Sequence, residues 1–102
     1  MTKQEKRKLI QSLLNEQQVE LFYKVLEEMG DLKADYYDYL ITSPINCEEE
    51  LKRVPDADYE LCAALLTMLL REDHFCNGSF ESRVHAGEVR PLLERMIDLL
   101  KA

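Results

Sequence analysis

Hydrophobic residues recur at helical spacing along almost the whole chain, and polar residues with capping preferences separate the periodic stretches. No stretch alternates apolar and polar residues with the period of two that a half-buried strand requires. The pattern therefore predicts an all-α fold of five to seven helices around one core. The predicted segments are a helix from Thr2, a second helix or kinked continuation from Glu16 to Gly30, a helix over residues 32–41, a short helix after Asn46, a helix from about Asp58 to Glu72, a short helix from Ser79 to Gly87 and a last helix from about Arg90.

Capping residues place several of these boundaries. Thr2 and Glu5 have capping-box spacing, in which the hydroxyl and the carboxylate each accept a backbone N–H, and Asn15 begins a similar pattern at the second helix. Gly30 suits the left-handed residue that ends a helix. Asp31 follows it and is expected to cap the third helix.

The segment from about Asp58 to Glu72 is apolar on nearly every side. Such a helix belongs in the middle of a domain, with other helices packed around it. Either Asp56 or Asp58 is expected to cap its start. Its narrow exposed stripe is expected to consist of four residues, Glu60, Ala64, Thr67 and Arg71.

The length of 102 residues predicts a single compact domain, since a second core would be too small to be stable. The basic helix over residues 1–14 either packs on this domain or protrudes from it. Three cysteines without a short-spaced pair, and the lack of a signal segment, predict a reduced, cytoplasmic protein. The longest apolar run, residues 61–70, is about half as long as a membrane crossing requires, so we expect no membrane span.

The formal net charge of −7 is concentrated in residues 15–60, which carry thirteen acidic and four basic side chains. A field of this sign repels phosphate backbones, so no nucleic-acid partner is predicted. The cluster of Lys3, Lys6, Arg7 and Lys8 is the one basic stretch, and it is more simply the solvated face of the first helix.

The turn after the central helix carries the densest set of polar side chains. Asp73, Asn77 and Gly78 match part of a calcium-binding loop, but positions three and twelve of that pattern lack a carboxylate or amide, which argues against calcium. The simpler interpretation is a helix–turn–helix in which Gly78 takes a positive φ while Phe75 and Phe80 close the corner. The residues that would serve a small-ligand site or an enzyme here are Arg71, Asp73, His74, Asn77 and Glu81.

Cysteine and histidine side chains near this turn are the other candidates for chemistry. His74, Cys76 and His85, with Cys62 as a fourth, could ligate a metal or pair as nucleophile and base, but they lack the paired spacing of zinc ligands. No orienting third group and no Gly-rich phosphate loop accompany them. We therefore predict no catalytic residue, no metal and no cofactor, and we expect the arginines after residue 70 to pair with the acidic residues between them.

The segment Asp35-Tyr36-Tyr37-Asp38-Tyr39 is the best candidate for partner recognition. Three tyrosines in four positions cannot all face inward on a helix, so at least one ring is expected at the surface or in a contact. Tyrosine offers a large, rigid contact area, which makes Tyr36, Tyr37 and Tyr39 candidate residues for binding a basic protein or a second copy of the chain. The alternative is that Tyr36 belongs to the core and the aspartates only solvate the outer face.

The block from Leu61 to Phe75, followed by Gly78-Ser79-Phe80, Arg83 and Gly87, resembles an uncharacterised bacterial family of small proteins, domain-of-unknown-function family six-five-zero-eight. The resemblance covers roughly the C-terminal half of the chain. It implies a bacterial or phage setting and transfers no catalytic residue. The predicted function is a small cytoplasmic bacterial interaction or regulatory module; the alternative is a small-ligand-binding protein or enzyme centred on the Arg71 to Glu81 turn.

Overall fold

The central helix predicted from the sequence is present in the computed structural model, which describes residues 1–101. Helix α4 (Tyr59–Phe75) is capped by Asp58, whose carboxylate accepts the Leu61 N–H at 2.8 Å. Every residue from Cys62 to Leu70 is buried. The helix continues three residues beyond the predicted end at Glu72, and this extension determines where Phe75 lies.

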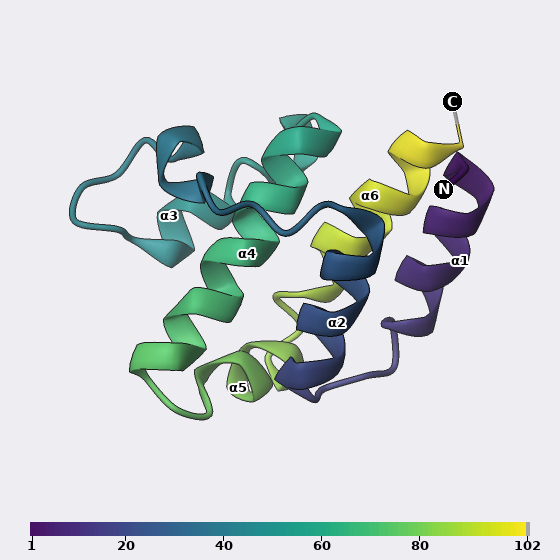
Figure 1. Cartoon of the computed structure of the whole chain (residues 1–102). Helices are drawn as coiled ribbons and strands as arrows, with labels where there is room; N and C mark the ends of the chain where they lie inside the picture. The colour runs from purple at the N-terminus through teal and green to yellow at the C-terminus, as the bar shows by residue number, and fades with distance from the viewer. Residues whose placement is uncertain (102) are drawn as a thin grey trace.

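Five further α-helices and two short 3-10 helices surround α4 (Figure 1), and residues 1–101 contain no strand. The all-α fold and the number of helices are therefore confirmed. In chain order the surrounding elements are α1 (Lys3–Ser12), α2 (Val19–Met29), η1 (Tyr36–Tyr39), α3 (Cys47–Leu51), η2 (Val54–Asp56), α5 (Ser79–His85) and α6 (Arg90–Leu100). None of the described helices is long and apolar enough to cross a bilayer.

Helices α1 and α6 pack against each other, which brings the two ends of the chain together (Figure 1). The predicted capping box at Thr2 and Glu5 starts α1, and Pro91 lies in the first turn of α6. Arg7 reaches across from α1 and donates to the carbonyl oxygen of Leu100 at 3.4 Å. The apolar face of α1 is buried in the common core.

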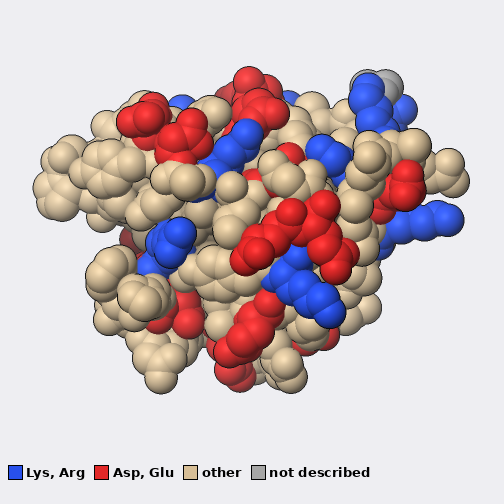
Figure 2. All heavy atoms as spheres, in the orientation of Figure 1, with Lys and Arg blue, Asp and Glu red and all other residues tan. Residues whose placement is uncertain are grey.

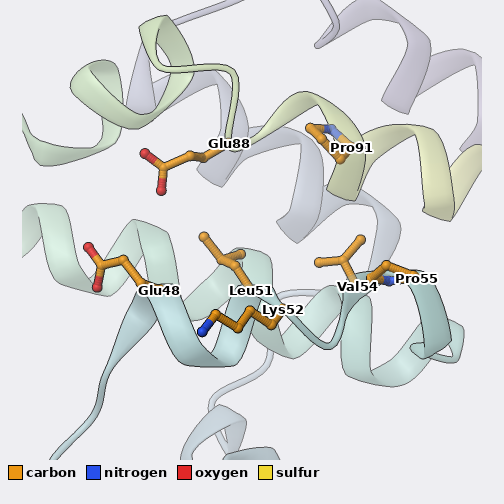
Figure 3. Close-up of a pocket in the computed structure, with 7 residues that line it drawn as sticks. All are labelled: Glu48, Leu51, Lys52, Val54, Pro55, Glu88 and Pro91. Carbon is orange, nitrogen blue, oxygen red and sulfur yellow. The ribbon is translucent and has the colours of Figure 1, made fainter.

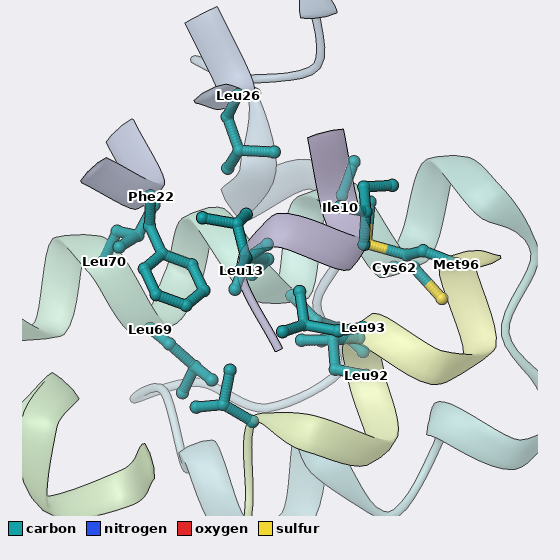
Figure 4. Packing of buried hydrophobic residues seen from close by; sticks show 14 of the residues in the cluster. Ile10, Leu13, Phe22, Leu26, Cys62, Leu69, Leu70, Leu92, Leu93 and Met96 are labelled. Atoms are coloured by element: carbon teal, nitrogen blue, oxygen red, sulfur yellow. The ribbon is translucent and has the colours of Figure 1, made fainter. Parts of the chain in front are cut away.

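The core joins α4 to α1, α2, α5 and α6 (Figure 4). Phe22 of α2 and Phe80 of α5 are fully buried, and their rings meet edge to face with centroids 4.7 Å apart. Edge-to-face contact is the favoured arrangement of two aromatic rings. Phe80 therefore fixes α5 to the rest of the domain.

The prediction of a helix over residues 32–41 is wrong. Gly30, with φ of 75°, ends α2 as expected, but the chain then runs extended across α4 and forms only the short η1. Asp31 does not cap a helix; its buried carboxylate accepts the Tyr59 hydroxyl at 2.7 Å and lies 3.3 Å from the Lys6 ammonium. These tertiary contacts outweigh the local capping preference.

The exposed stripe predicted on α4 is also wrong for Ala64 and Thr67, which are both buried. The segment before η1 contacts Thr67. The Lys33 N–H donates to the Thr67 hydroxyl oxygen at 3.1 Å, and that hydroxyl donates to the Ala63 carbonyl at 2.8 Å. Thr67 thus serves as the polar attachment point of this segment.

The start of the second helix was placed three residues too early, because α2 begins at Val19 and not at Glu16. After α1 the chain forms a turn in which the Glu16 N–H donates to the Leu13 carbonyl at 3.1 Å. Gln18 precedes the helix without a side-chain capping bond. The capping pattern at Asn15 is therefore not used at this helix start.

Candidate functional site

The turn between α4 and α5 is held by Asp73. One oxygen of its carboxylate accepts the N–H groups of Gly78 and Phe80, at 3.1 and 3.0 Å. Gly78 has the predicted positive φ, at 91°, and occupies the N-cap position of α5, so that Ser79 is the first residue of the helix. Asp73 thus supplies the N-terminal acceptor of α5 from outside that helix.

The five candidate ligand residues of this turn border three different hollows. Asp73, His74 and Asn77 line one together with α2 residues, Arg71 lines a second, and Glu81 lines a third with His85. Cys76 lies with Arg71 in the second. Within residues 1–101, no group of three or more His, Cys, Asp or Glu side chains could hold a metal ion.

Contrary to the prediction, Phe75 does not close the corner with Phe80. Phe80 is buried against Phe22, but Phe75 is 81% exposed. Because α4 continues to Phe75, this ring projects from the last turn of the helix, with its edge against the His74 ring at 5.1 Å between centroids. The domain therefore presents a large aromatic side chain to solvent.

The three tyrosines of η1 have different environments. Tyr36 is half-buried against the core, Tyr37 is 54% exposed, and Tyr39 is half-buried. The rings of Tyr36 and Tyr37 meet edge to face with centroids 6.4 Å apart. The expectation that at least one ring lies at the surface is confirmed by Tyr37.

A mainly apolar groove of about 220 Å³ lies between the end of α4, η1 and the start of α3. It is lined by Tyr36, Ile45, Cys47, Met68, Arg71, Glu72, Phe75 and Cys76. Tyr37 stands beside Tyr36 in η1, and Ile41, which is 70% exposed, belongs to the loop that also carries Ile45. We call the set Tyr36, Tyr37, Ile41, Ile45, Met68 and Phe75 the Tyr37–Phe75 surface.

The loop of this surface contains no charged residue, since the chain is uncharged from Tyr39 to Cys47. Figure 2 shows it as the uncharged projection on the left of the molecule. Single exposed apolar residues are common on proteins, whereas larger contiguous apolar patches often belong to interaction sites. Nothing in the sequence indicated this groove, because it joins the stretch from Tyr36 to Cys47 to the end of α4, more than twenty residues later in the chain.

Glu50 fixes the same loop from beneath. Its fully buried carboxylate accepts the backbone N–H groups of Ile41 and Thr42 at 2.9 and 2.7 Å and the Thr42 hydroxyl at 2.5 Å. Arg53 donates to its other oxygen at 2.9 Å and also to the Tyr39 carbonyl at 2.9 Å. Burial raises the pKa of Glu50, but the hydrogen bonds from Thr42, Arg53 and Ile41 outweigh it and hold this pKa below its ordinary value.

Arg83 of α5 is the centre of an ion-pair cluster behind the groove. Its guanidinium binds Glu72 through two bonds of 2.6 and 2.7 Å, Glu88 at 2.8 Å and Glu48 at 3.3 Å. The paired Arg83 lowers the pKa of Glu72, and Glu72 in turn raises that of Arg83. The expected pairing between arginines and acidic residues is found for Arg83 and for Arg90 with Glu94, whereas Arg71 and Arg95 make no ion pair within residues 1–101. The Arg83 pairs connect α3, α4 and α5.

A further hollow, distinct from the three described above and about 350 Å³ in volume, lies on the other side of α3 (Figure 3). Its floor is formed by Leu51, Val54, Pro55 and Pro91, and Glu48, Lys52 and Glu88 stand at its rim. These rim charges are already paired, Glu48 and Glu88 with Arg83 and Lys52 with Glu49. The hollow therefore offers apolar area without a free polar group to orient a ligand.

The three cysteines differ in reactivity. Burial and the charge of Glu72 raise the pKa of the Cys47 thiol to about 12, and burial raises the pKa of Cys62 to about 11. Cys62 is buried in α4, as predicted, whereas Cys76 is exposed at the groove. Since the thiolate is the nucleophilic form, Cys47 and Cys62 are poor nucleophiles.

The comparisons with known proteins give one result. No curated protein and no solved structure matches the chain. A family of unknown function, DUF6508, matches residues 2–102, which extends the resemblance from the C-terminal half to essentially the whole sequence. The chain therefore belongs to the DUF6508 family.

Proposed function

We propose that this protein is an interaction module that binds a partner protein through the Tyr37–Phe75 surface. The observation that carries the proposal is an apolar groove with the exposed ring of Phe75 in its lining, next to segments of the chain that also expose Tyr37 and Ile41. Burying such side chains in a contact contributes about 25 cal/mol per Å² of apolar area removed from water. A groove flanked by projecting aromatic rings is the form that interaction hot spots commonly take.

The groove is also rigidly supported, which favours recognition. Glu50 and Arg53 hold the loop on one side, and the Arg83 cluster holds Glu72 on the other. A preformed surface loses less conformational entropy on binding than a mobile one. The Tyr36 and Tyr37 side chains belong to this supported surface, so the proposal retains two of the three tyrosines as partner-binding residues.

A small-ligand site at the Arg71 to Glu81 turn has less support. Its five residues border separate hollows, and Asp73 is engaged as the acceptor for α5. The proposed setting of the interaction module is the bacterial cytoplasm, which the three free cysteines suit.

Affinity capture from extract of the native cells tests the proposed function. The wild-type chain is expected to retain a partner protein that the variants Ile41→Ser and Phe75→Ser lose, because each removes exposed apolar area from the surface. Leu21→Ser is the matched control, since Leu21 is an exposed apolar residue of α2 that does not line the groove. Replacing Tyr36, Tyr37 and Tyr39 singly by Ala then tests which side chains of η1 contribute to partner binding.

Partner recovery that is equal for the wild type, Ile41→Ser and Phe75→Ser would contradict the proposal. Loss in the Leu21→Ser control as well would show that capture depends on general surface hydrophobicity and would contradict it too. Circular dichroism melting curves verify that each variant is folded before capture.

A further inference from the structure

The Tyr37–Phe75 surface has unequal charge on its two sides. The η1 side carries Asp35 and Asp38, which are exposed and make no ion pair within residues 1–101. No basic residue occurs between Ala34 and Leu51. At the start of α3, Glu49 pairs with Lys52, and Glu48 shares the single positive charge of Arg83 with Glu72 and Glu88.

The α4 side of the groove carries one unpaired cation. Arg71 lines the groove, is exposed and makes no ion pair within the described residues, and the neighbouring Glu72 is paired with Arg83. Lys33, which precedes η1, is paired with Glu60. The two carboxylates of this surface that have no ion-pair partner within the described residues, Asp35 and Asp38, therefore lie on the η1 side, next to Tyr37, in a protein whose net charge is −7.

The size of the groove limits what can enter it. A volume of about 220 Å³ accommodates one large apolar side chain, since a benzene ring fits a cavity of about 150 Å³. Met68, Ile45 and Tyr36 form the apolar walls, and Phe75 projects at the rim. An occupant would therefore insert a single anchor and lie across Phe75.

We propose that the partner presents a peptide segment with one aromatic or branched aliphatic anchor, which fills the groove, and Lys or Arg residues beside it, which face Asp35 and Asp38. This inference rests on the proposed function and specifies the partner's chemistry. Opposite charges at the rim of an apolar contact select a partner and orient it.

A second copy of the chain fits less well. Two molecules of net charge −7 repel each other, and a symmetric contact would bring the Asp35–Asp38 side of each copy to the same interface. A nucleic acid would be repelled by the same charges.

A displayed library of random 12-residue peptides, panned on the full chain, tests the inference. The expected enriched sequences combine one large apolar residue with at least one Lys or Arg and carry no excess of acidic residues. A synthetic peptide of the most enriched sequence is then titrated by fluorescence anisotropy. Phe75→Ser is expected to weaken its binding about tenfold or more. The double variant Asp35→Asn/Asp38→Asn is expected to weaken it about fivefold.

Leu21→Ser is again the control and is expected to leave the affinity unchanged. Enrichment of acidic or uncharged peptides, or no enrichment above a blank surface, would overturn the inference. So would wild-type affinity in either Phe75→Ser or Asp35→Asn/Asp38→Asn. Light scattering of the protein alone tests whether a second copy of the chain occupies this surface. A dimer that Phe75→Ser dissociates would also overturn the inference.

The two failures can be told apart. If Ile41→Ser and Phe75→Ser abolish capture of the native partner but the library yields no basic peptides, the interaction surface stands and the proposed chemistry of the partner is wrong. If capture is unaffected by both groove variants, the proposed function itself fails.

Discussion

Replacing Glu50 with alanine is expected to destabilise the protein by about 3–5 kcal/mol, because it removes one partner of a buried, hydrogen-bonded ion pair. The N–H groups of Ile41 and Thr42 lose their acceptor, and Arg53 loses its carboxylate. The loop of the Tyr37–Phe75 surface is then free to separate from α3. Urea denaturation of the variant and the wild type measures the difference in the free energy of unfolding.

The pH dependence of the free energy of unfolding separates the effect of the Glu50 charge from the effect of its side-chain shape. A carboxyl whose pKa is lowered on folding stabilises the protein above its unfolded pKa, near the ordinary value of 4.5, and this contribution is lost as the pH falls through the folded pKa. Glu50→Gln keeps the shape and one acceptor oxygen but does not titrate. The stability difference between the wild type and Glu50→Gln is therefore expected to shrink below pH 4.5; a difference that is constant from pH 7 to pH 3 would contradict this role.

Replacing Phe80 with alanine is expected to cost about 3–5 kcal/mol of stability, as is usual for a fully buried phenylalanine. The substitution leaves a cavity and removes the edge contact with Phe22. Phe75→Ala is the matched control, since it makes the same chemical change five positions earlier at a side chain that is 81% exposed. Its expected effect on stability is within about 0.5 kcal/mol.

Thermal and urea unfolding of the two phenylalanine variants compare these effects directly. Equal destabilisation by Phe75→Ala and Phe80→Ala would show that Phe75 is packed in the folded protein, and the interaction surface described above would lose its most exposed residue. A small effect of Phe80→Ala would contradict the account of how α5 is attached to the core.

The sequence predicted the parts of the fold that depend on local signals. The capping box at Thr2, the left-handed Gly30 and Gly78, the short helix after Asn46 and the last helix from Arg90 are all found in the structure. The apolar character of α4 correctly placed it at the centre. These features follow from residues within one or two turns of each other, which is the range over which sequence patterns are informative.

The errors arose where distant residues decide the conformation. Asp31 has the side chain of a helix cap, but a buried contact with Tyr59 uses it instead. Thr67 was expected to face water, but the segment that leads to η1 covers it. Phe75 and Phe80 are equivalent in a local pattern, and only the length of α4 and the position of Phe22 separate the exposed ring from the buried one.

The candidate surface was likewise predictable only where local sequence signals determine it. The tyrosines of η1 were recognised from their spacing, but Ile41, Ile45 and Phe75 were not associated with them. The groove depends on the Glu50 and Arg83 networks, which connect residues up to 35 positions apart. No pattern within a single helix contains that information.

Position-specific photo-crosslinking tests the central claim most directly. The crosslinking amino acid p-benzoylphenylalanine replaces Phe75 in one variant and Leu21 in another, and both variants are irradiated in extract of the native cells. A discrete protein adduct is expected at position 75, where excess wild-type chain suppresses it, and no such adduct is expected at position 21. Adducts of equal yield at both positions, or none at position 75, would contradict it.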